Sequence, residues 1–246
     1  MLSRALVELF ADPELAAAVA FRGGTALHKL FLPAPMRYSE DLDLVQVDSG
    51  PIGPLFDRIK TVLVPWLGEP RRASGPGGAT LTFRFPASTL PAQDLRLKVE
   101  INTREHFALL GHASLPFAVA SPWFSGTCAV RTFAIEELLA TKLRALYQRR
   151  KGRDLFDLWL ALVSLPVDAG KVVEGFSRYL AAEGLAVSRA EFEANLAAKL
   201  SSPGFLGDLA PLVPARLAYD PVAAEALVRS RLVERLPGEP WRGRSG

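Results

Sequence analysis

The hydrophobic pattern mixes strand and helix periods over about the first 130 residues and is helical beyond them, and this difference constrains the fold more than any other feature. From Leu95 to Asn102 apolar and polar residues alternate strictly, with leucine, valine and isoleucine at every second position. A period of two is typical of a β-strand that buries one face and exposes the other. Beyond residue 133 the pattern turns helical. The sequence therefore predicts an α/β region, residues 1–132, followed by a helical region, residues 133–236.

Individual elements follow from the same patterns and from turn residues. In the first region we expect helices at 2–10, 13–20, 26–31 and 54–67, and strands at 41–47, 79–85, 95–102 and 128–131. In the second region we expect helices at 135–149, 154–164, 168–183, 188–199 and 221–236. Residues 71–78 are predicted to be an exposed loop, and residues 103–127 to be irregular, because both are rich in turn residues. Residues 237–246 are expected to form a flexible tail.

Composition places the chain among ordinary globular proteins. Its 246 residues are 49% hydrophobic and 22% charged, which is enough to bury a sizeable core. The net charge of +3 permits a nucleotide or nucleic-acid partner without requiring one. The single cysteine, Cys128, leaves no internal disulfide and no cysteine-based metal site. We expect neither a signal peptide nor a membrane span, and therefore a cytoplasmic protein without a membrane partner.

Two aspartates, Asp41 and Asp43, lie two positions apart in the predicted strand Asp-Leu-Asp-Leu. On a strand they share one face at a separation of about 6.5–7 Å, where two carboxylates repel each other. Either a solvated strand end or a bound divalent cation could offset this repulsion. Glu100 lies on the polar face of another strand, and three such oxygen ligands would suit one or two Mg²⁺ ions. The alternative for Glu100 is a surface ion pair with Lys98 or Arg96.

A glycine pair precedes the aspartates. Gly23, Gly24 and Thr25 lie between a short apolar run and the start of a predicted helix. Two glycines allow backbone N–H groups to come close to a ligand, and a helix N-terminus attracts phosphate. The alternative is a simple tight turn in which Thr25 caps the helix.

The order of these motifs resembles the nucleotidyltransferase superfamily, in which a Gly-Gly turn is followed by a D-x-D pair and a distal carboxylate. More narrowly, FRGGTALHKLF followed by RYSEDLDL is similar to the AbiEii/AbiGii branch, which includes MenT-like toxins that modify tRNA. That branch typically reads Gly-Gly-Thr-Ala-Leu, then Arg-aromatic-Ser-x-Asp-[Ile/Leu]-Asp-Leu. Each position is matched here, at Gly23–Leu27 and Arg37–Leu44.

Two motifs in the helical region extend the resemblance. Residues 136–146 are similar to the family's lysine-bearing helix, and residues 151–158 to its Arg-Asp-x-x-Asp-Leu element. The resemblance implies that Lys142 contacts the nucleotide triphosphate and that Asp154 and Asp157 complete the catalytic site. Without the resemblance, Lys142 could simply extend to solvent beside an apolar stripe. Asp154 could simply be a charge favoured by the helix dipole.

The resemblance also implies a fold and a function. The expected fold is a mixed β-sheet of the nucleotidyltransferase type with a helical C-terminal region. The expected activity is that of a type IV-like toxin of bacterial toxin–antitoxin and phage-defence systems. With Mg²⁺, or alternatively Mn²⁺, it would transfer a nucleotide from an NTP to the 3′ end of tRNA and block translation. A cognate antitoxin is the expected partner. The alternatives are a small-molecule or protein acceptor, and a nucleotide-binding module without turnover.

Overall fold

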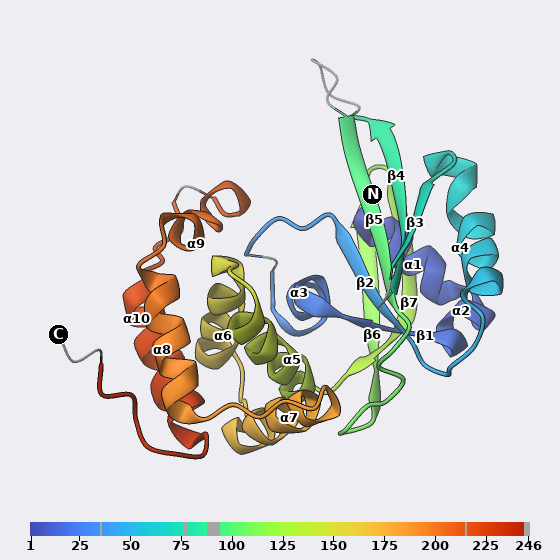
Figure 1. Ribbon diagram of the computed structural model, residues 1–246. Coiled ribbons are helices and arrows are strands. Elements are labelled where there is room, and N and C mark those ends of the chain that lie inside the picture. The colour runs from blue at the N-terminus through green and yellow to red at the C-terminus, as the bar shows by residue number, and fades with distance from the viewer. Residues whose placement is uncertain (35, 76–77, 88–93, 215, 244–246) are drawn as a thin grey trace. The chain divides into compact units, whose positions relative to one another are not determined.

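The computed structural model describes residues 1–34, 36–75, 78–87, 94–214 and 216–243 (Figure 1). Contacts divide the chain into two compact units, each described separately below. The first unit comprises Met1–Leu30 and Ser39–Ala134, and the second comprises Phe31–Tyr38 and Ile135–Gly246. The predicted boundary after residue 132 differs from this division chiefly in the segment 31–38, which groups with the helical part. Of the predicted flexible tail, residues 244–246 lie outside the described residues.

The first unit is built on a mixed sheet. Its described residues form seven strands in the order β3-β4-β5-β2-β1-β7-β6. The strands are β1 (Val19–Arg22), β2 (Asp41–Gln46), β3 (Arg71–Gly75), β4 (Gly78–Pro86), β5 (Asp94–Asn102), β6 (His112–Ser121) and β7 (Phe124–Phe133). Strand β2 runs parallel to β5, and β1 runs parallel to β7, whereas the other neighbours are antiparallel. The predicted mixed sheet is confirmed.

One face of this sheet is apolar and covered by helices. The alternation seen in the sequence buries Leu97, Val99 and Ile101 of β5 beside Leu42 and Leu44 of β2. The helices α1 (Leu2–Ala11), α2 (Pro13–Ala18) and α4 (Ile52–Leu67) gather on one side of the sheet (Figure 1). Because strand side chains alternate between faces, the acidic residues of β2 and β5 lie on the opposite, polar face.

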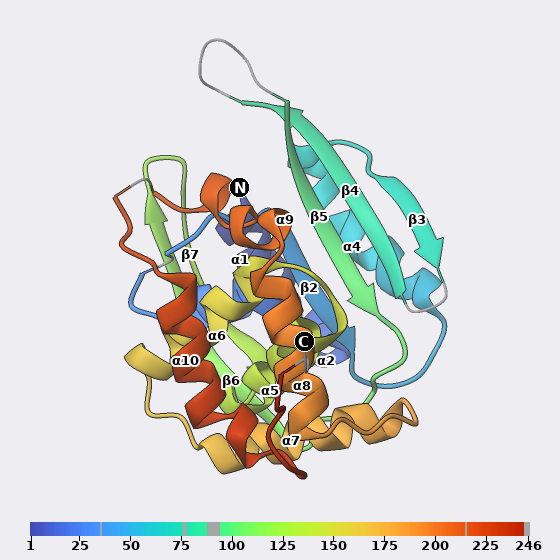
Figure 2. The same cartoon turned by 60° about the vertical axis from the view of Figure 1, so that its left-hand side comes forward.

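Four strands correct the sequence-based expectations. Residues 103–127 were expected to be irregular, but they contain β6 and the first part of β7, which form a long hairpin. Pro116 lies within β6, which a central strand would not tolerate but an edge strand does. Strand β3 occupies part of the predicted loop 71–78 and pairs with β4 (Figure 2). Strand β1 replaces the end of the predicted helix 13–20, since α2 stops at Ala18.

A short helical stretch connects β1 to the segment that precedes β2. The helix α3 (Gly23–Ala26) begins directly after β1 and continues as a π-helix, Leu27–Phe31. Contacts of α3 with β1 and β2 hold the start of this stretch against the sheet. The predicted helix 26–31 is therefore present but starts three residues earlier.

The second unit is helical, as predicted. Its elements are α5 (Ile135–Gln148), α6 (Gly152–Ser164), α7 (Ala169–Ala182), α8 (Arg189–Leu200), α9 (Pro203–Gly207), α10 (Pro221–Arg231) and two 3₁₀ turns, Ala210–Leu212 and Val233–Arg235. Helix α5 packs against α6 and α7. Asp168 accepts hydrogen bonds from backbone N–H groups at the start of α7, and Ser188 forms a capping box with Glu191 at the start of α8. Within the described residues no helix is long and apolar enough to cross a membrane.

Candidate functional site

Strand pairing places four charged side chains of the first unit next to one another. In the parallel pair of β2 and β5, Asp41 is the neighbour of Lys98, and Asp43 is the neighbour of Glu100. Neighbouring strands lie about 4.8 Å apart, and residues two apart on a strand lie about 6.5–7 Å apart. The four residues therefore form a rectangle on the polar face, which we call the charged rectangle.

Glu100 has a counter-ion in this structure. Lys98, on the same face of the same strand, forms an ion pair with the Glu100 carboxylate. The two side chains are 29% and 40% exposed, so the pair lies at the surface. The hydrogen bond with Glu100 raises the pKa of Lys98 above its usual value, which keeps the ammonium charged. Of the two alternatives that the sequence left open for Glu100, the surface ion pair is present.

The Asp41 side chain is partly exposed to solvent, but one of its carboxylate oxygens is buried. Asp41 Oδ1 accepts no hydrogen bond from any described residue, and Lys98 Nζ lies 3.9 Å from it. Burial raises the pKa of Asp41; the Lys98 ammonium opposes this effect and the Glu100 carboxylate adds to it. A buried carboxylate oxygen without a hydrogen bond is costly, which makes it an attractive ligand for a cation.

Gly23 packs against the other aspartate. Its backbone has a positive φ of 80°, which favours glycine. A Cβ atom built at this position would lie 2.2 Å from Oδ2 of Asp43, far inside van der Waals contact. The first residue of α3 thus lies directly beside the Asp43 carboxylate, and only glycine fits there without moving it.

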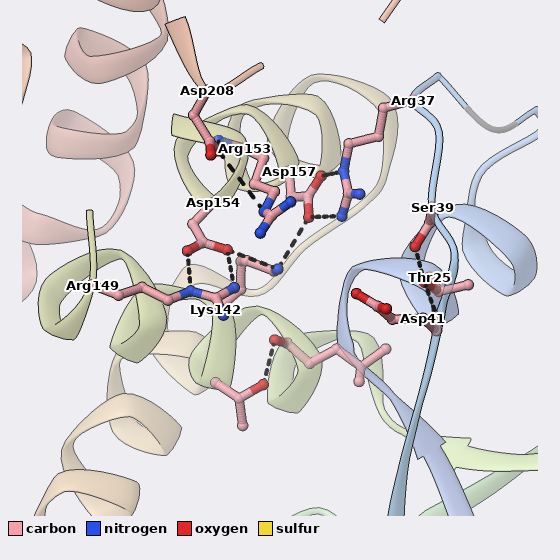
Figure 3. A network of polar contacts seen from close by, with 12 residues as sticks. Thr25, Arg37, Ser39, Asp41, Lys142, Arg149, Arg153, Asp154, Asp157 and Asp208 are labelled. Atoms are coloured by element: carbon pink, nitrogen blue, oxygen red, sulfur yellow. Dashed lines mark hydrogen bonds and ion pairs between the residues drawn. The ribbon is translucent and has the colours of Figure 1, made fainter. Parts of the chain in front are cut away.

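Thr25 connects the glycine turn to the segment that leads into β2. Its buried hydroxyl donates a hydrogen bond to the backbone oxygen of Asp41 over 2.8 Å and lies 2.5 Å from the Ser39 hydroxyl (Figure 3). The side chain therefore fixes the backbone around the aspartates. Thr25 does not cap the helix, because it lies within α3 and the N-cap residue is Arg22.

A cavity of about 460 Å³ opens on the polar face beside the charged rectangle. Asp43 and Glu100 contribute to its wall, together with Arg22 and Asn102 and with residues at the facing ends of β3 and β4. Arg22 is the neighbour of Asp43 across β1 and β2 and forms an ion pair with Glu105. The volume falls within the range of small-molecule sites.

The carboxylates fit a divalent cation only in part. Among the described residues, no group of three or more acidic, histidine or cysteine side chains has the geometry of a metal site. Asp41 and Asp43 nevertheless present carboxylates from one face of one strand, and Asp41 Oδ1 has no hydrogen bond to satisfy it. Hard cations such as Mg²⁺ are often bound by one or two carboxylates plus substrate phosphates. The pair therefore fits such a cation, while Glu100 is held by Lys98.

The predicted residues of the second unit form a buried charge network (Figure 3). Lys142 Nζ, on α5, lies 3.0 Å from Asp154 Oδ1 and 3.1 Å from Asp157 Oδ2, both on α6. Both carboxylates are fully buried and the Lys142 side chain is 9% exposed. Lys142 therefore does not extend to solvent, and the structure brings together all three residues predicted from this region.

Two arginines complete this network. Arg37 donates to both oxygens of Asp157, over 2.7 and 2.8 Å. Arg149 likewise donates to both oxygens of Asp154. Burial by itself would raise the pKa of Asp154, but Lys142 and Arg149 outweigh it and hold the pKa below its usual value. Such bidentate pairs are strong and geometrically specific.

No functional role was predicted for these arginines or for Lys98 from the sequence. Arg37 was recognised only as part of a motif, and its carboxylate partner lies 120 positions away. No periodicity or spacing predicts such a pairing. Lys98 was considered only as a surface partner of Glu100, and its closeness to Asp41 depends on which strands pair.

Comparisons with known proteins point to one family. The model of a family described as "Nucleotidyl transferase AbiEii toxin, Type IV TA system" matches residues 4–229 of the chain. Among proteins of curated function, none is significantly similar in sequence.

Solved structures share the fold. The nucleotidyltransferase toxin MenT4 from Mycobacterium tuberculosis superposes with a TM-score of 0.61 at 19% identity, covering 96% of this chain and 83% of that one. JHP933 from Helicobacter pylori gives a TM-score of 0.57 at 20% identity, covering 94% and 87%. At such low identities, the likeness establishes a shared fold and not a shared substrate.

Proposed function

We propose, because the chain belongs to the AbiEii family of nucleotidyltransferase toxins, that it transfers a nucleoside monophosphate from an NTP to the 3′-hydroxyl of tRNA. Family membership makes the chain a nucleotidyltransferase and implies an NTP substrate and a cognate antitoxin. The acceptor, the metal and the effect on translation are parts of the proposal. The observation that carries it is the position of Asp43, which lies beside Gly23 and in the wall of the cavity.

In this proposal Asp41 and Asp43 hold a divalent cation, Mg²⁺ or Mn²⁺, with Glu100 as an assisting ligand. When bound, the cation would neutralise charge on the triphosphate and on the leaving pyrophosphate. The orphaned Oδ1 of Asp41 supports this role, because a cation would satisfy it. The Asp43 carboxylate lies on the same strand face as Asp41 and could bind the same cation. Gly23 has no side chain and so leaves this carboxylate in place.

The glycine turn is assigned to the triphosphate. Backbone N–H groups of Gly23 and Gly24 lie at the start of α3, where phosphate oxygens are favoured. Thr25 serves this site indirectly, since its hydroxyl fixes the backbone of Asp41. An acceptor hydroxyl then attacks the α-phosphate in line, and pyrophosphate leaves.

Lys142 is assigned to phosphate charge neutralisation, as the family resemblance implies. An ammonium group has three N–H donors, and its ion pairs with Asp154 and Asp157 leave capacity for one further acceptor. The two carboxylates hold the Lys142 ammonium group in a fixed position. We therefore assign Asp154 and Asp157 a positioning role, exerted through Lys142.

A tRNA acceptor is consistent with the charge of the chain. Its 29 Lys and Arg residues exceed its 26 Asp and Glu residues, so a polyanionic acceptor meets no net repulsion. If the 3′ end of tRNA carried extra nucleotides, translation would be blocked. The antitoxin would then counteract this activity.

The test is nucleotide incorporation into total RNA from each of the four α-labelled NTPs, with Mg²⁺ or Mn²⁺. The wild type is compared with Asp41→Asn/Asp43→Asn, which keeps the shape of both side chains. Asp48→Asn is the matched control, because Asp48 follows β2 and is exposed. We expect label in a tRNA-sized band for the wild type and the control, and none for the double variant.

The other outcomes are equally informative. Label on a small molecule or on protein, with none on RNA, would overturn the tRNA acceptor while keeping the activity. Undiminished labelling of tRNA by the folded double variant would overturn the roles of Asp41 and Asp43. An absence of label from every NTP with folded wild-type protein would leave a nucleotide-binding module without turnover.

A further inference from the structure

The charged rectangle contains one residue whose role the proposed function does not explain. Three of its corners are acids, Asp41, Asp43 and Glu100, and the fourth is Lys98. Lys98 forms an ion pair with Glu100 along its own strand, and its ammonium lies 3.9 Å from Asp41 Oδ1 across to β2. A cationic group therefore already lies between two of the three carboxylates from which the proposed metal site is built.

We propose that Lys98 is an exchangeable counter-ion of this site. In the protein without metal it holds Glu100, and it releases Glu100 when a divalent cation and an NTP bind. Its ammonium then pairs with a phosphate oxygen of the NTP. This inference rests on the proposed function, because it takes Asp41 and Asp43 as the residues that hold the cation.

Electrostatic repulsion favours such an exchange. Three carboxylates within this small area repel one another, and Lys98 offsets that repulsion while no cation is bound. A divalent cation placed at Asp41 would lie close to the Lys98 ammonium, and like charges at such distances repel. Binding of the cation therefore favours a Lys98 side chain that has moved away.

The ion pair of Lys98 with Glu100 is also easily broken. The side chains of Lys98 and Glu100 are both partly exposed, and exposed ion pairs typically contribute about 0–1 kcal/mol. The Lys142 pairs on α5 and α6 differ in kind, since their carboxylates are fully buried. Solvent can thus replace either partner of the Lys98 pair at little cost, which an exchange requires.

The Lys98 ammonium is also suited to bind a phosphate group. A lysine carries a compact, strongly hydrated charge on a flexible stem, and it suits phosphate as a point charge. Glu100, with which Lys98 forms its ion pair, lies together with Asp43 in the wall of the same cavity. Because the stem of Lys98 is flexible, its ammonium can leave the Glu100 carboxylate for a phosphate oxygen bound beside it.

The experiment measures two affinities for Lys98→Met. Mn²⁺ binding without nucleotide is measured by electron paramagnetic resonance, and we expect it to be roughly tenfold tighter than in the wild type, since a competing charge is removed. Binding of α,β-methylene analogues of the four NTPs is then measured at saturating Mn²⁺. We expect the affinity for the preferred analogue to be roughly tenfold weaker, since a charged phosphate contact is lost.

Three further variants serve as controls for Lys98→Met. Lys60→Met removes a partly exposed lysine of α4 that pairs with Glu69 at 2.9 Å, and we expect it to change neither affinity. Lys98→Gln tests whether the effects depend on the apolar methionine, and it should move both affinities as Lys98→Met does. Lys98→Arg keeps the charge and should bind Mn²⁺ no more tightly than the wild type.

Opposite changes in the two affinities are the signature of exchange, because a merely structural lysine would weaken both or neither. Mn²⁺ binding by Lys98→Met that is unchanged or weaker would overturn the inference. Tighter Mn²⁺ binding with unchanged analogue binding would overturn its phosphate half. A wild type that binds no Mn²⁺, even with the analogues present, would instead overturn the proposed metal site.

Discussion

The variant Gly23→Ala tests why a glycine lies beside the proposed metal ligand Asp43. Two reasons are possible, the backbone conformation and the lack of space for a side chain. The positive φ of 80° makes any L side chain unfavourable, by about 1–2 kcal/mol. The added Cβ would also lie 2.2 Å from Asp43 Oδ2, whereas ordinary van der Waals contact begins at 3.4 Å. The carboxylate oxygen must therefore retreat by about 1.2 Å. Metal–ligand distances tolerate deviations of only about 0.2 Å, so Asp43 would leave the coordination shell.

We expect the affinity of Gly23→Ala for Mn²⁺ to fall by roughly 10–100-fold, the range seen when groups that orient metal ligands are lost. Isothermal titration calorimetry with Mn²⁺ measures this, and urea unfolding measures stability. The matched control is Gly111→Ala, because Gly111 has a φ of 75° in the same unit but open space around its Cβ position.

The control should lose about 1–2 kcal/mol of stability, as any L residue at positive φ does, while its Mn²⁺ affinity stays unchanged. Gly23→Ala should lose at least as much stability and the Mn²⁺ affinity as well. Equal Mn²⁺ affinities in the wild type and Gly23→Ala would refute the reasoning that Gly23 keeps Asp43 in place to hold a cation.

Three further expectations concern stability. Arg37→Met should lower the free energy of unfolding by about 3–5 kcal/mol, since it breaks a buried pair with Asp157; Arg37→Lys should lose less in the same urea titration, and equal losses would contradict the bidentate pairing. Because the pKa of Asp154 is held below its usual value, its stabilising effect is complete above about pH 4 and is lost as the pH falls through the lowered pKa. The acid-induced loss of stability should therefore be shallower in Asp154→Asn, and identical slopes in acid unfolding curves would contradict this. Thr25→Val should cost about 1–3 kcal/mol in thermal unfolding, because a buried hydroxyl and its bond to the Asp41 backbone are lost; a wild-type midpoint would contradict it.

Local sequence patterns predicted much of the fold. The alternation from Leu95 to Asn102 predicted β5 and its buried face, and the helical periods predicted α5 to α8 to within two residues at each end. The same patterns missed the hairpin of β6 and β7. Its alternation was present in Leu115, Phe117 and Val119, but Pro116 and the surrounding turn residues obscured it. An edge strand tolerates such a proline. The sequence of β6 alone does not show that this strand lies at the edge of the sheet.

The sequence by itself determined which residues of each element share a face. It placed Asp41 with Asp43 on one side of a strand, and Asp154 with Asp157 on one side of a helix, because both relations depend only on backbone periodicity. It also supplied the motifs by which the family resemblance was recognised, and the family match confirms that resemblance.

Only the tertiary structure decided which elements meet. That β2 pairs with β5 makes Lys98 a neighbour of Asp41 and Glu100 a neighbour of Asp43. Arg37 binds Asp157, 120 positions later, and the segment 31–38 belongs to the helical unit. The physical reason is that periodicity specifies a face but not its partner. Partners are selected by the packing and charge complementarity of the whole chain, which depend on residues far apart in sequence.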